Sequence, residues 1–333
     1  MAEQVKEALK ETLTLEDHFV RRFWAYLQER FPLGSHGLLI VSYYSSNSFL
    51  AQVLTHPDRT LSYNLGSLLG AITMLCLFFH LRVFDEHKDY EEDLQHYPER
   101  VLQRGLVTLR HLRNLGLAAI AAELIISFCW QPLGIPGPFV AVLIALGYSI
   151  LMRYEFFVPH WLRQRFLLYT ISHMLIMPLF ALVVYSFATG RYPWEAPPWF
   201  WVYSWVGFFV TLNWEISRKI RAPEDEITGV HSYSSLFGPM FAASLVLIVR
   251  AIDTFLVWLV GEHLGLSIWF TVSLIALYLV CVLGFVQFHR QPNRTHAKRL
   301  ETFAGMYIIA FDALLAIELG RRQGVVWEWW PQL

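Results

Sequence analysis

Residues 82–105 read RVFDEHKDYEEDLQHYPERVLQRG and place a dense run of charges directly after a strongly apolar segment. Asp85, Asp89 and Asp93 are spaced by four, so on a helix each step turns about 40° and rises about 6 Å. All three would then lie on one face, where like charges repel. Such a face is tolerated when the carboxylates meet water or a cation, and Mg²⁺ prefers a few carboxylates plus phosphate oxygens of a substrate. The stretch therefore predicts a cation site at the end of an apolar segment.

The composition excludes an ordinary soluble enzyme. Hydrophobic residues make up 55% of the 333 positions and charged residues only 16%, which is typical of a multi-pass membrane protein. The sequence contains no Walker loop, no GxSxG motif, no zinc-like His/Cys spacing and no basic patch with interleaved aromatic residues. A nucleic-acid partner is therefore not expected.

Nine apolar segments are long enough to span a bilayer as helices. They cover residues 37–55, 61–84, 107–131, 137–156, 165–188, 198–217, 234–260, 267–288 and 299–320. The middle of the first is polar from Tyr43 to Ser48, so it can span only if those groups face the interior of a helix bundle. We expect an all-α polytopic protein with about nine transmembrane helices around a central cavity.

The two ends of the chain differ from the middle. Residues 1–34 show the spacing of an amphipathic helix and are expected to lie on the membrane surface, an interfacial segment with its basic residues toward lipid headgroups. Those residues are Lys6, Lys10, Arg21, Arg22 and Arg30. Residues 35–322 form the transmembrane domain, and residues 323–333 form a Trp-rich C-terminal tail.

The distribution of Lys and Arg predicts the orientation. With the N-terminus in the cytoplasm and nine spans, the outer side receives only Arg59, Arg191, Arg321 and Arg322 out of 26 basic residues, and Arg250 lies within a span. Cytoplasmic loops carry the excess of positive charge. The acidic stretch would thus open to the cytoplasm, at the cell membrane if the protein is bacterial.

A second polar cluster closes the sixth segment, on the same side as the first. Residues 213–238 read NWEISRKIRAPEDEITGVHSYSSLFG, with Glu215, Arg218 and Lys219 on adjacent faces of a helix end. Pro223 is expected to end this helix and to leave the following acids on a loop. Two acidic groups facing each other across a cavity could hold Mg²⁺ ions that bridge a diphosphate.

The first stretch resembles the opening motif of the UbiA-type intramembrane prenyltransferase superfamily, N-x-x-x-D-x-x-x-D followed by P-x-R-P and a Gly. The matching positions are Asp85, Asp89, Asp93, Pro98, Arg100 and Gly105. Asp85 replaces the Asn and Val101 replaces the second Pro. The nine-span layout and the position of the second cluster extend the resemblance to most of the chain.

The second motif of that family, D-x-x-x-D before a Gly and a Ser/Thr-rich turn, is matched less well. Asp225 takes the last Asp position, but the first then falls on Arg221, and a shift by one pairs Ala222 with Glu226. One metal ligand is therefore missing or replaced. A guanidinium at position 221 could bind diphosphate oxygens instead.

The resemblance implies Mg²⁺-dependent transfer of a prenyl group from an isoprenyl diphosphate to a hydrophobic acceptor in the bilayer, aromatic or lipid-like. The catalytic acids would be Asp85, Asp89 and Asp93. These three, together with Asp225 and Glu226, would ligate metal. The diphosphate would be bound by Arg100, Arg218, Lys219 and Arg221.

Two other functions remain open at this point. A membrane terpene cyclase of the same superfamily would use the same acids without an acceptor, and a non-enzymatic transporter or scaffold would use them as an ion path. Arg250 and Asp253 share a helix face and are interpreted as a buried ion pair. His80 and His173 are interpreted as hydrogen-bonded core histidines.

Overall fold

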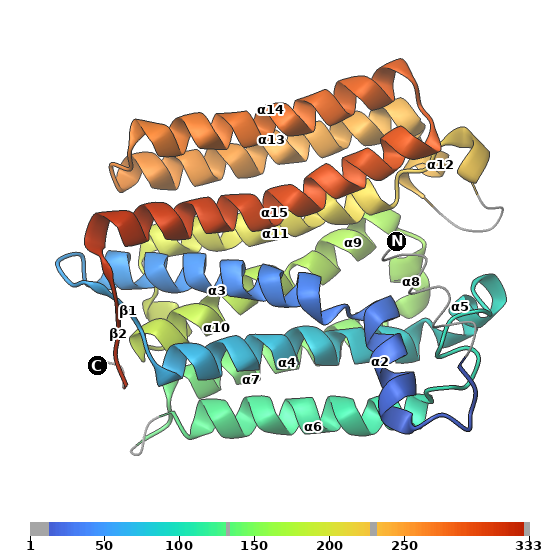
Figure 1. The fold of residues 1–333 in the computed structure, drawn as a ribbon, viewed down its shortest axis with the longest axis horizontal. Helices are drawn as coiled ribbons and strands as arrows, with labels where there is room; N and C mark the ends of the chain where they lie inside the picture. The colour runs from blue at the N-terminus through green and yellow to red at the C-terminus, as the bar shows by residue number, and fades with distance from the viewer. Residues whose placement is uncertain (1–12, 131–133, 227–231, 330–333) are drawn as a thin grey trace.

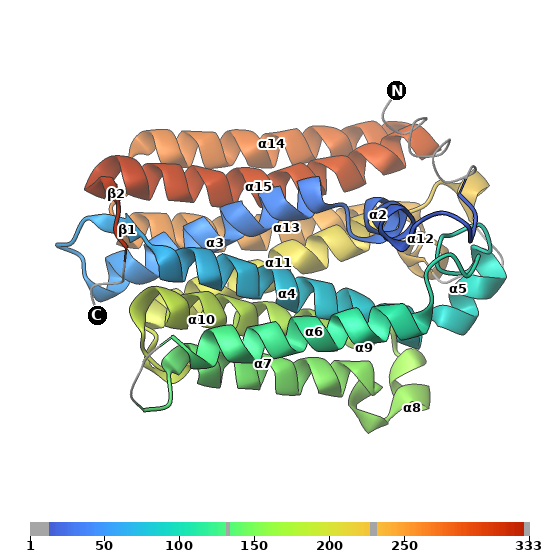
Figure 2. The same cartoon turned by 60° about the horizontal axis from the view of Figure 1, so that its bottom comes forward.

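The computed structural model describes residues 13–130, 134–226 and 232–329, and nearly all of it is helix. Figures 1 and 2 show long helices running side by side in one bundle. The helices that fill the nine predicted apolar ranges are α3 (Leu33–Thr55), α4 (Leu65–Lys88), α6 (Leu109–Phe128), α7 (Gly137–Arg153), α9 (Phe166–Met174), α10 (Ile176–Thr189), α11 (Pro198–Arg218), α13 (Pro239–His263), α14 (Ile268–Arg290) and α15 (Arg294–Gln323). The shorter elements are α2 (Phe19–Arg30), α5 (Tyr90–His96), α8 (Pro159–Arg163), α12 (Tyr233–Phe237), the 3-10 turns η1 (Glu155–Phe157), η2 (Pro193–Glu195) and η3 (Pro223–Asp225), and the strands β1 (Leu61–Tyr63) and β2 (Val325–Trp327). The predicted all-α class is confirmed.

Within the described ranges, six helical segments are long and apolar enough to cross a membrane. They are α4, α6, the continuous pair α9 and α10, α13, α14 and α15. Helix α7 is apolar but shorter, and α3 and α11 are not among the six. The bundle therefore has the character of a multi-pass membrane protein, whereas the number of nine spans stays a prediction.

The helices form a closed ring in which the last helix returns to the first. Each neighbours the next along the chain, and α15 packs against α3. Helices α10 and α11 also pack against α3 and α15 respectively. The main apolar core lies among these helices and includes Phe180, Val183 and Phe200, all fully buried.

The polar middle of α3 faces the bundle interior. Tyr43, Ser46 and Asn47 are all buried, and the hydroxyl groups of Ser46 and Tyr203 donate to the carboxylate of Asp312 on α15. A polar group inside a bilayer needs such partners because no water is available there. The sequence required these polar groups to face the bundle interior if the segment is to span a membrane, and they do so.

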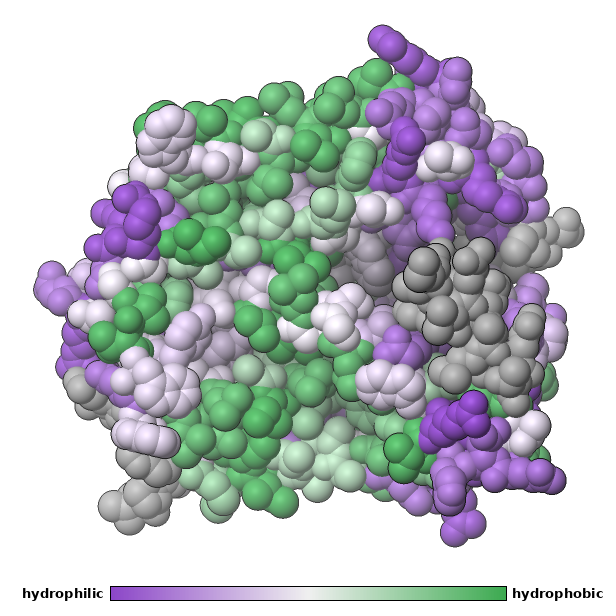
Figure 3. All heavy atoms as spheres, in the orientation of Figure 1, coloured by the Kyte–Doolittle hydropathy of each residue, from purple (hydrophilic) through white to green (hydrophobic). Residues whose placement is uncertain are grey.

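The two ends of the bundle are polar, and its middle is apolar (Figure 3). At one end, β1 pairs in parallel with β2, so the C-terminal tail is partly a strand held against the α3–α4 connection. We call the other end, where α4 gives way to α5, the acidic end; α8 and α12 lie there too (Figure 1). The acidic end carries the residues that the sequence analysis singled out.

The N-terminal segment differs in part from the prediction. Lys6 and Lys10 lie outside the described residues. On α2, Arg21 is exposed, but Arg22 donates to the carbonyl oxygen of Leu106 and Arg30 pairs with two carboxylates. The prediction that Arg22 and Arg30 face lipid headgroups is therefore wrong, because buried acceptors of the bundle bind them instead.

Candidate active site

Two helices, rather than one, carry the three motif aspartates. Helix α4 ends at Lys88, α5 begins at Tyr90, and Asp89 caps both with φ −99° and ψ 5°. Backbone hydrogen bonds still run from the Asp89 N–H to the Asp85 oxygen (2.8 Å) and from the Asp93 N–H to the Asp89 oxygen (2.9 Å). The expected four-residue repeat survives, but the break at Asp89 turns α5 away from the bundle axis.

Asp85 and Asp89 are the two motif acids that have no arginine partner among the described residues. The Asp85 side chain is 43% exposed, and its Oδ1 accepts a hydrogen bond from Lys88 Nζ at 3.3 Å. Burial raises the pKa of Asp89 to about 6, with the carboxylates of Asp85 and Asp93 adding to the effect and Lys88 opposing it. Negative charge is thus crowded around Asp89, and a bound cation would relieve the repulsion.

Asp93, the third acid of the motif, is already paired. Its Oδ2 accepts hydrogen bonds from Arg100 Nη1 at 2.6 Å and from Arg30 Nη2 at 3.4 Å. The Arg100 guanidinium also lies 3.8 Å from the centre of the Tyr97 ring. The structure thus places Asp93 and Arg100 against each other rather than against Asp85.

Two cations at the end of α11, Arg218 and Lys219, lie on the side of these acids. Arg218 and Lys219 both pair with Glu215, at 2.5 and 2.7 Å, and the Arg218 charge lies within electrostatic range of Asp85. Lys219 Nζ lies 5.1 Å from the centre of the Phe166 ring. The structure therefore brings the Arg218 end of α11 within electrostatic range of Asp85 in the first acidic motif.

The structure adds two residues that the sequence analysis did not assign. Lys88 Nζ lies 5.3 Å from the centre of the Tyr169 ring, which stacks on His173 with ring centres 4.1 Å apart. Lys88 could have been found from its place between Asp85 and Asp89 in the motif. Tyr169 gives no sequence signal, because aromatic residues are frequent in every apolar segment of this chain.

The two acids of the second motif face other partners. Asp225 forms a bidentate ion pair with Arg294 at the start of α15, which lowers the pKa of Asp225. Glu226 accepts a hydrogen bond from the Ser232 hydroxyl at 2.8 Å. Within the described ranges, no three or more His, Cys, Asp or Glu side chains gather closely enough to hold a metal ion. The five predicted metal ligands thus do not converge on one site.

Arg221 contrasts with the other cations of the second motif. Its backbone N–H donates to the Ser234 hydroxyl at 2.7 Å. Its Nη1 is buried and has no hydrogen-bond partner among the described residues. A buried N–H group without a partner is costly, so this guanidinium has the capacity to bind an anion.

Asp85 and Asp89 together fit one Mg²⁺ ion. Neither is bound by an arginine, and Mg²⁺ is usually held by one or two carboxylates plus the phosphate oxygens of a substrate. Asp93 and Asp225 would first have to release their arginines. The donor set thus fits a site that is completed by a diphosphate rather than an all-protein cage.

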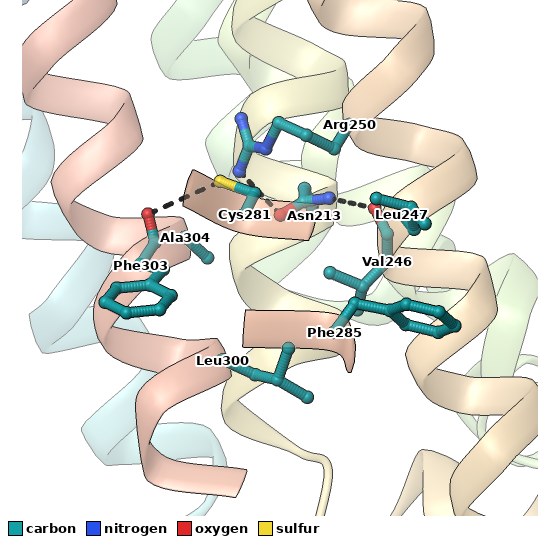
Figure 4. Close-up of a pocket in the computed structure, with 9 residues that line it drawn as sticks. All are labelled: Asn213, Val246, Leu247, Arg250, Cys281, Phe285, Leu300, Phe303 and Ala304. Carbon is teal, nitrogen blue, oxygen red and sulfur yellow. Dashed lines mark hydrogen bonds between the residues drawn. The ribbon is translucent and has the colours of Figure 1, made fainter. Parts of the chain in front are cut away.

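A buried ion pair lies deeper in the bundle, between Arg250 and Asp253. Between α11, α13, α14 and α15, Arg250 lines a small cavity whose remaining wall includes Val246, Phe285 and Phe303 (Figure 4). Arg250 Nη1 pairs with Asp253 Oδ2 at 2.8 Å and Nη2 donates to Asn213 Oδ1 at 2.6 Å. The predicted ion pair is confirmed within α13, and the Asn213 contact ties Arg250 to α11.

Both core histidines are hydrogen-bonded, as predicted. His80 Nδ1 lies 2.7 Å from Glu123 Oε1, and His80 Nε2 lies 3.0 Å from Ser149 Oγ. His173 Nδ1 donates to the carbonyl oxygen of Tyr169 at 2.8 Å, while its buried Nε2 has no partner among the described residues.

Known proteins provide the remaining evidence. The model of the UbiA prenyltransferase family matches residues 48–308. A search of curated proteins found no match. A solved UbiA homolog from Aeropyrum pernix K1 is similar with a TM-score of 0.62 and 16% identity, covering 86% of this chain and 98% of that one. A structure described for digeranylgeranylglyceryl phosphate synthase in membranes is similar with a TM-score of 0.58 and 15% identity, covering 90% of this chain and 99% of that one. A UbiA homolog from Archaeoglobus fulgidus is similar with a TM-score of 0.54 and 16% identity, covering 88% of this chain and 99% of that one.

These findings agree with one another. The solved structures share the helical fold over nearly their whole length, and the six apolar segments indicate an integral, multi-pass membrane protein. The family match includes both motifs and spans most of the chain. The chain belongs to the UbiA prenyltransferase family.

Proposed function

We propose that this protein is a Mg²⁺-dependent intramembrane prenyltransferase, which moves a prenyl group from an isoprenyl diphosphate to a lipophilic acceptor, aromatic or lipid-like. The observation that carries the proposal is the meeting of Asp85 and Asp89 with the cations Lys88 and Arg218 at the mouth of an apolar bundle. Family membership supports a prenyltransferase-type enzyme.

The acids would bind the metal ion, and the cations would bind the diphosphate. Asp85 and Asp89 would hold the metal, which when bound neutralises the diphosphate as it leaves. Lys88 would attract the diphosphate from the first motif. Arg218 and Lys219 share the single carboxylate of Glu215, so this group keeps a net positive charge for the same anion. Asp93 and Arg100 would position the loop around the site.

The departure in the second motif would be compensated by Arg221. Its Nη1, which has no partner among the described residues, can donate to a diphosphate oxygen, and its charge can partly replace that of a second ion. Asp225 and Glu226 are bound to Arg294 and Ser232, so we give them a secondary role in holding the loop. The active site would thus depend on fewer metal ligands than the five that the sequence predicts.

The acidic end and the N-terminus would lie in the cytoplasm, at the cell membrane if the protein is bacterial. The excess of Lys and Arg on this side supports that orientation. An isoprenyl diphosphate would then approach from the cytoplasm, with its apolar tail entering the bundle or the bilayer.

The direct test incubates the purified protein with Mg²⁺ and farnesyl or geranylgeranyl diphosphate, first alone and then with lipophilic phenols and lipid alcohols. We expect slow diphosphate release alone and a prenylated product with an acceptor. Asp89→Asn should abolish both, whereas Asp17→Asn, at an exposed pair on the N-terminal segment, should not. A cyclic terpene formed without any acceptor would identify the cyclase instead, and no diphosphate release with any donor would favour the transporter.

A further inference from the structure

The N-terminal segment is fastened to the loop that carries the end of the first motif. Tyr26 and Leu27 of α2 are buried in one apolar cluster with Val101 and Leu102, and α2 crosses the ends of α4 and α6 (Figure 1). A buried tyrosine and leucine contribute several kcal/mol of apolar burial between them, by the usual ~1.5–3 kcal/mol per large side chain. The two segments thus form one packed unit.

Polar contacts join the same two segments. Arg22 Nη1 donates to the carbonyl oxygen of Leu106 at 2.9 Å, and the Val101 N–H donates to Glu29 Oε2 at 2.9 Å. Arg104 Nη2 donates to the carbonyl oxygen of Leu13 at 2.9 Å. These bonds fix the register of α2 along the loop, which apolar packing alone would leave free.

Arg30 lies at the end of α2 and bridges the helix break at Asp89. Its Nε donates to Glu86 Oε1 on α4 at 2.6 Å, and its Nη2 donates to Asp93 Oδ2 on α5 at 3.4 Å. Glu86 is buried and Asp89 lies between these two acceptors in the chain. The guanidinium therefore ties together the two helices that meet at a candidate metal ligand.

We infer that Arg30 is a positioning residue for the acidic site: by bridging Glu86 and Asp93 it fixes the angle between α4 and α5, and so the placement of Asp89 beside Asp85. The family match begins at residue 48, so this contribution comes from a part of the chain that lies before the matched range. The inference rests on the proposed function of the acidic end, and it adds the N-terminal segment to that site.

The chemistry of the bridge calls for arginine. A guanidinium offers N–H groups in a rigid fork to two carboxylates at once, whereas a lysine ammonium is a point charge on a flexible stem. Arg30→Gln would lose the charge and the contact with Asp93. Arg30→Lys would keep the charge and should restore part of the effect.

The experiment compares wild type, Arg30→Gln, Arg30→Lys and the control Arg21→Gln, which removes the exposed pair between Arg21 of the same helix and Asp17 just before it. Hydrogen exchange is measured for peptides covering residues 89–105 and, as a reference, α13. The Mg²⁺ midpoint is measured twice, from diphosphate release and from the Mg²⁺-induced rise in Tm. The second readout needs no turnover, so loss of the proposed function and loss of this inference are distinguishable.

We expect Arg30→Gln to speed exchange at residues 89–105 and to raise the Mg²⁺ midpoint about 10-fold, the size of effect usual when a residue that orients a metal ligand is lost. Arg30→Lys should fall between this variant and wild type, and Arg21→Gln should match wild type. The double variant Arg30→Gln with Glu86→Gln removes the buried unpaired carboxylate and protects against misfolding, yet should still raise the midpoint. A midpoint unchanged in both Arg30→Gln and the double variant would overturn the inference, even if exchange became faster.

Discussion

Asp253→Asn tests how much the bundle depends on its buried ion pair. The change keeps the shape of the side chain but leaves the Arg250 guanidinium, which is 1% exposed, without its counter-ion. Breaking a buried pair from one side costs about 3–5 kcal/mol. We expect Asp253→Asn to lower the free energy of unfolding by about 3 kcal/mol, the low end of this range. The Asn213 oxygen at 2.6 Å and the Tyr307 ring at 3.8 Å still face the Arg250 guanidinium and stabilise its charge.

Replacing both partners should be milder than replacing one. Arg250→Leu with Asp253→Leu removes both charges. The Asn213 oxygen then loses its donor, and the Thr254 hydroxyl loses one of its acceptors but keeps the Arg250 carbonyl oxygen. We therefore expect the free energy of unfolding to fall by about 1–2 kcal/mol. Arg321→Gln is the matched control, because Arg321 pairs with Glu318 at the same i, i+3 spacing but is 61% exposed. That change should cost at most about 1 kcal/mol.

The free energy of unfolding would be measured by denaturant titration in detergent micelles, followed through the exposure of Cys281, which lines the cavity beside Arg250 (Figure 4). The reasoning is refuted if Asp253→Asn costs no more than Arg321→Gln. It is equally refuted if the double Leu variant loses as much as the two single Leu variants combined.

Three further predictions concern the site and its orientation. Asp89→Ala should abolish diphosphate release while the protein stays folded, by its Tm, because losing one of several crowded carboxylates also relieves repulsion; near-normal turnover would contradict the metal assignment. Arg221→Ala should weaken prenyl diphosphate binding by about 1.5–3 kcal/mol, and Arg221→Asp should raise the Mg²⁺ dependence of turnover; KM and Mg²⁺ midpoint equal to wild type would show that Arg221 only anchors the loop. A cysteine introduced by Gln95→Cys should react with a membrane-impermeant maleimide from the cytoplasmic side, and labelling from outside would invert the topology.

Hydrophobic patterning predicted where the helices lie, but two breaks came from backbone details. The predicted segment 165–188 is divided at Leu175 because Pro178 has no N–H to continue the ladder to Met174. The segment expected from residue 234 begins as the short α12 and restarts at Pro239, after Gly238 adopts φ +81°. Pro178 and Gly238 can both be read from the sequence, but a prediction based on the length of apolar segments takes no account of them.

The spacing of the first motif predicted three aspartates on one helix face, but the helix breaks at Asp89 and Asp93 pairs with Arg100 of the same motif. Asp93 also binds Arg30, and Asp225 binds Arg294, partners that lie 63 and 69 positions away in the chain. Such ion pairs depend on how α2 and α15 pack, and no local pattern reports that. Lys88 lies three positions after Asp85 within the motif, so the sequence could have predicted their contact on one helix face.

The closure of the ring by α15 has a consequence for biosynthesis. Ser46 donates to Asp312, 266 positions later, so the first helix of the ring leaves the ribosome long before its partner exists. Until then the Ser46 hydroxyl lacks its Asp312 acceptor, which would make α3 poorly retained in a bilayer as an isolated segment. The bundle can therefore close through α3 and α15 only after translation has nearly ended.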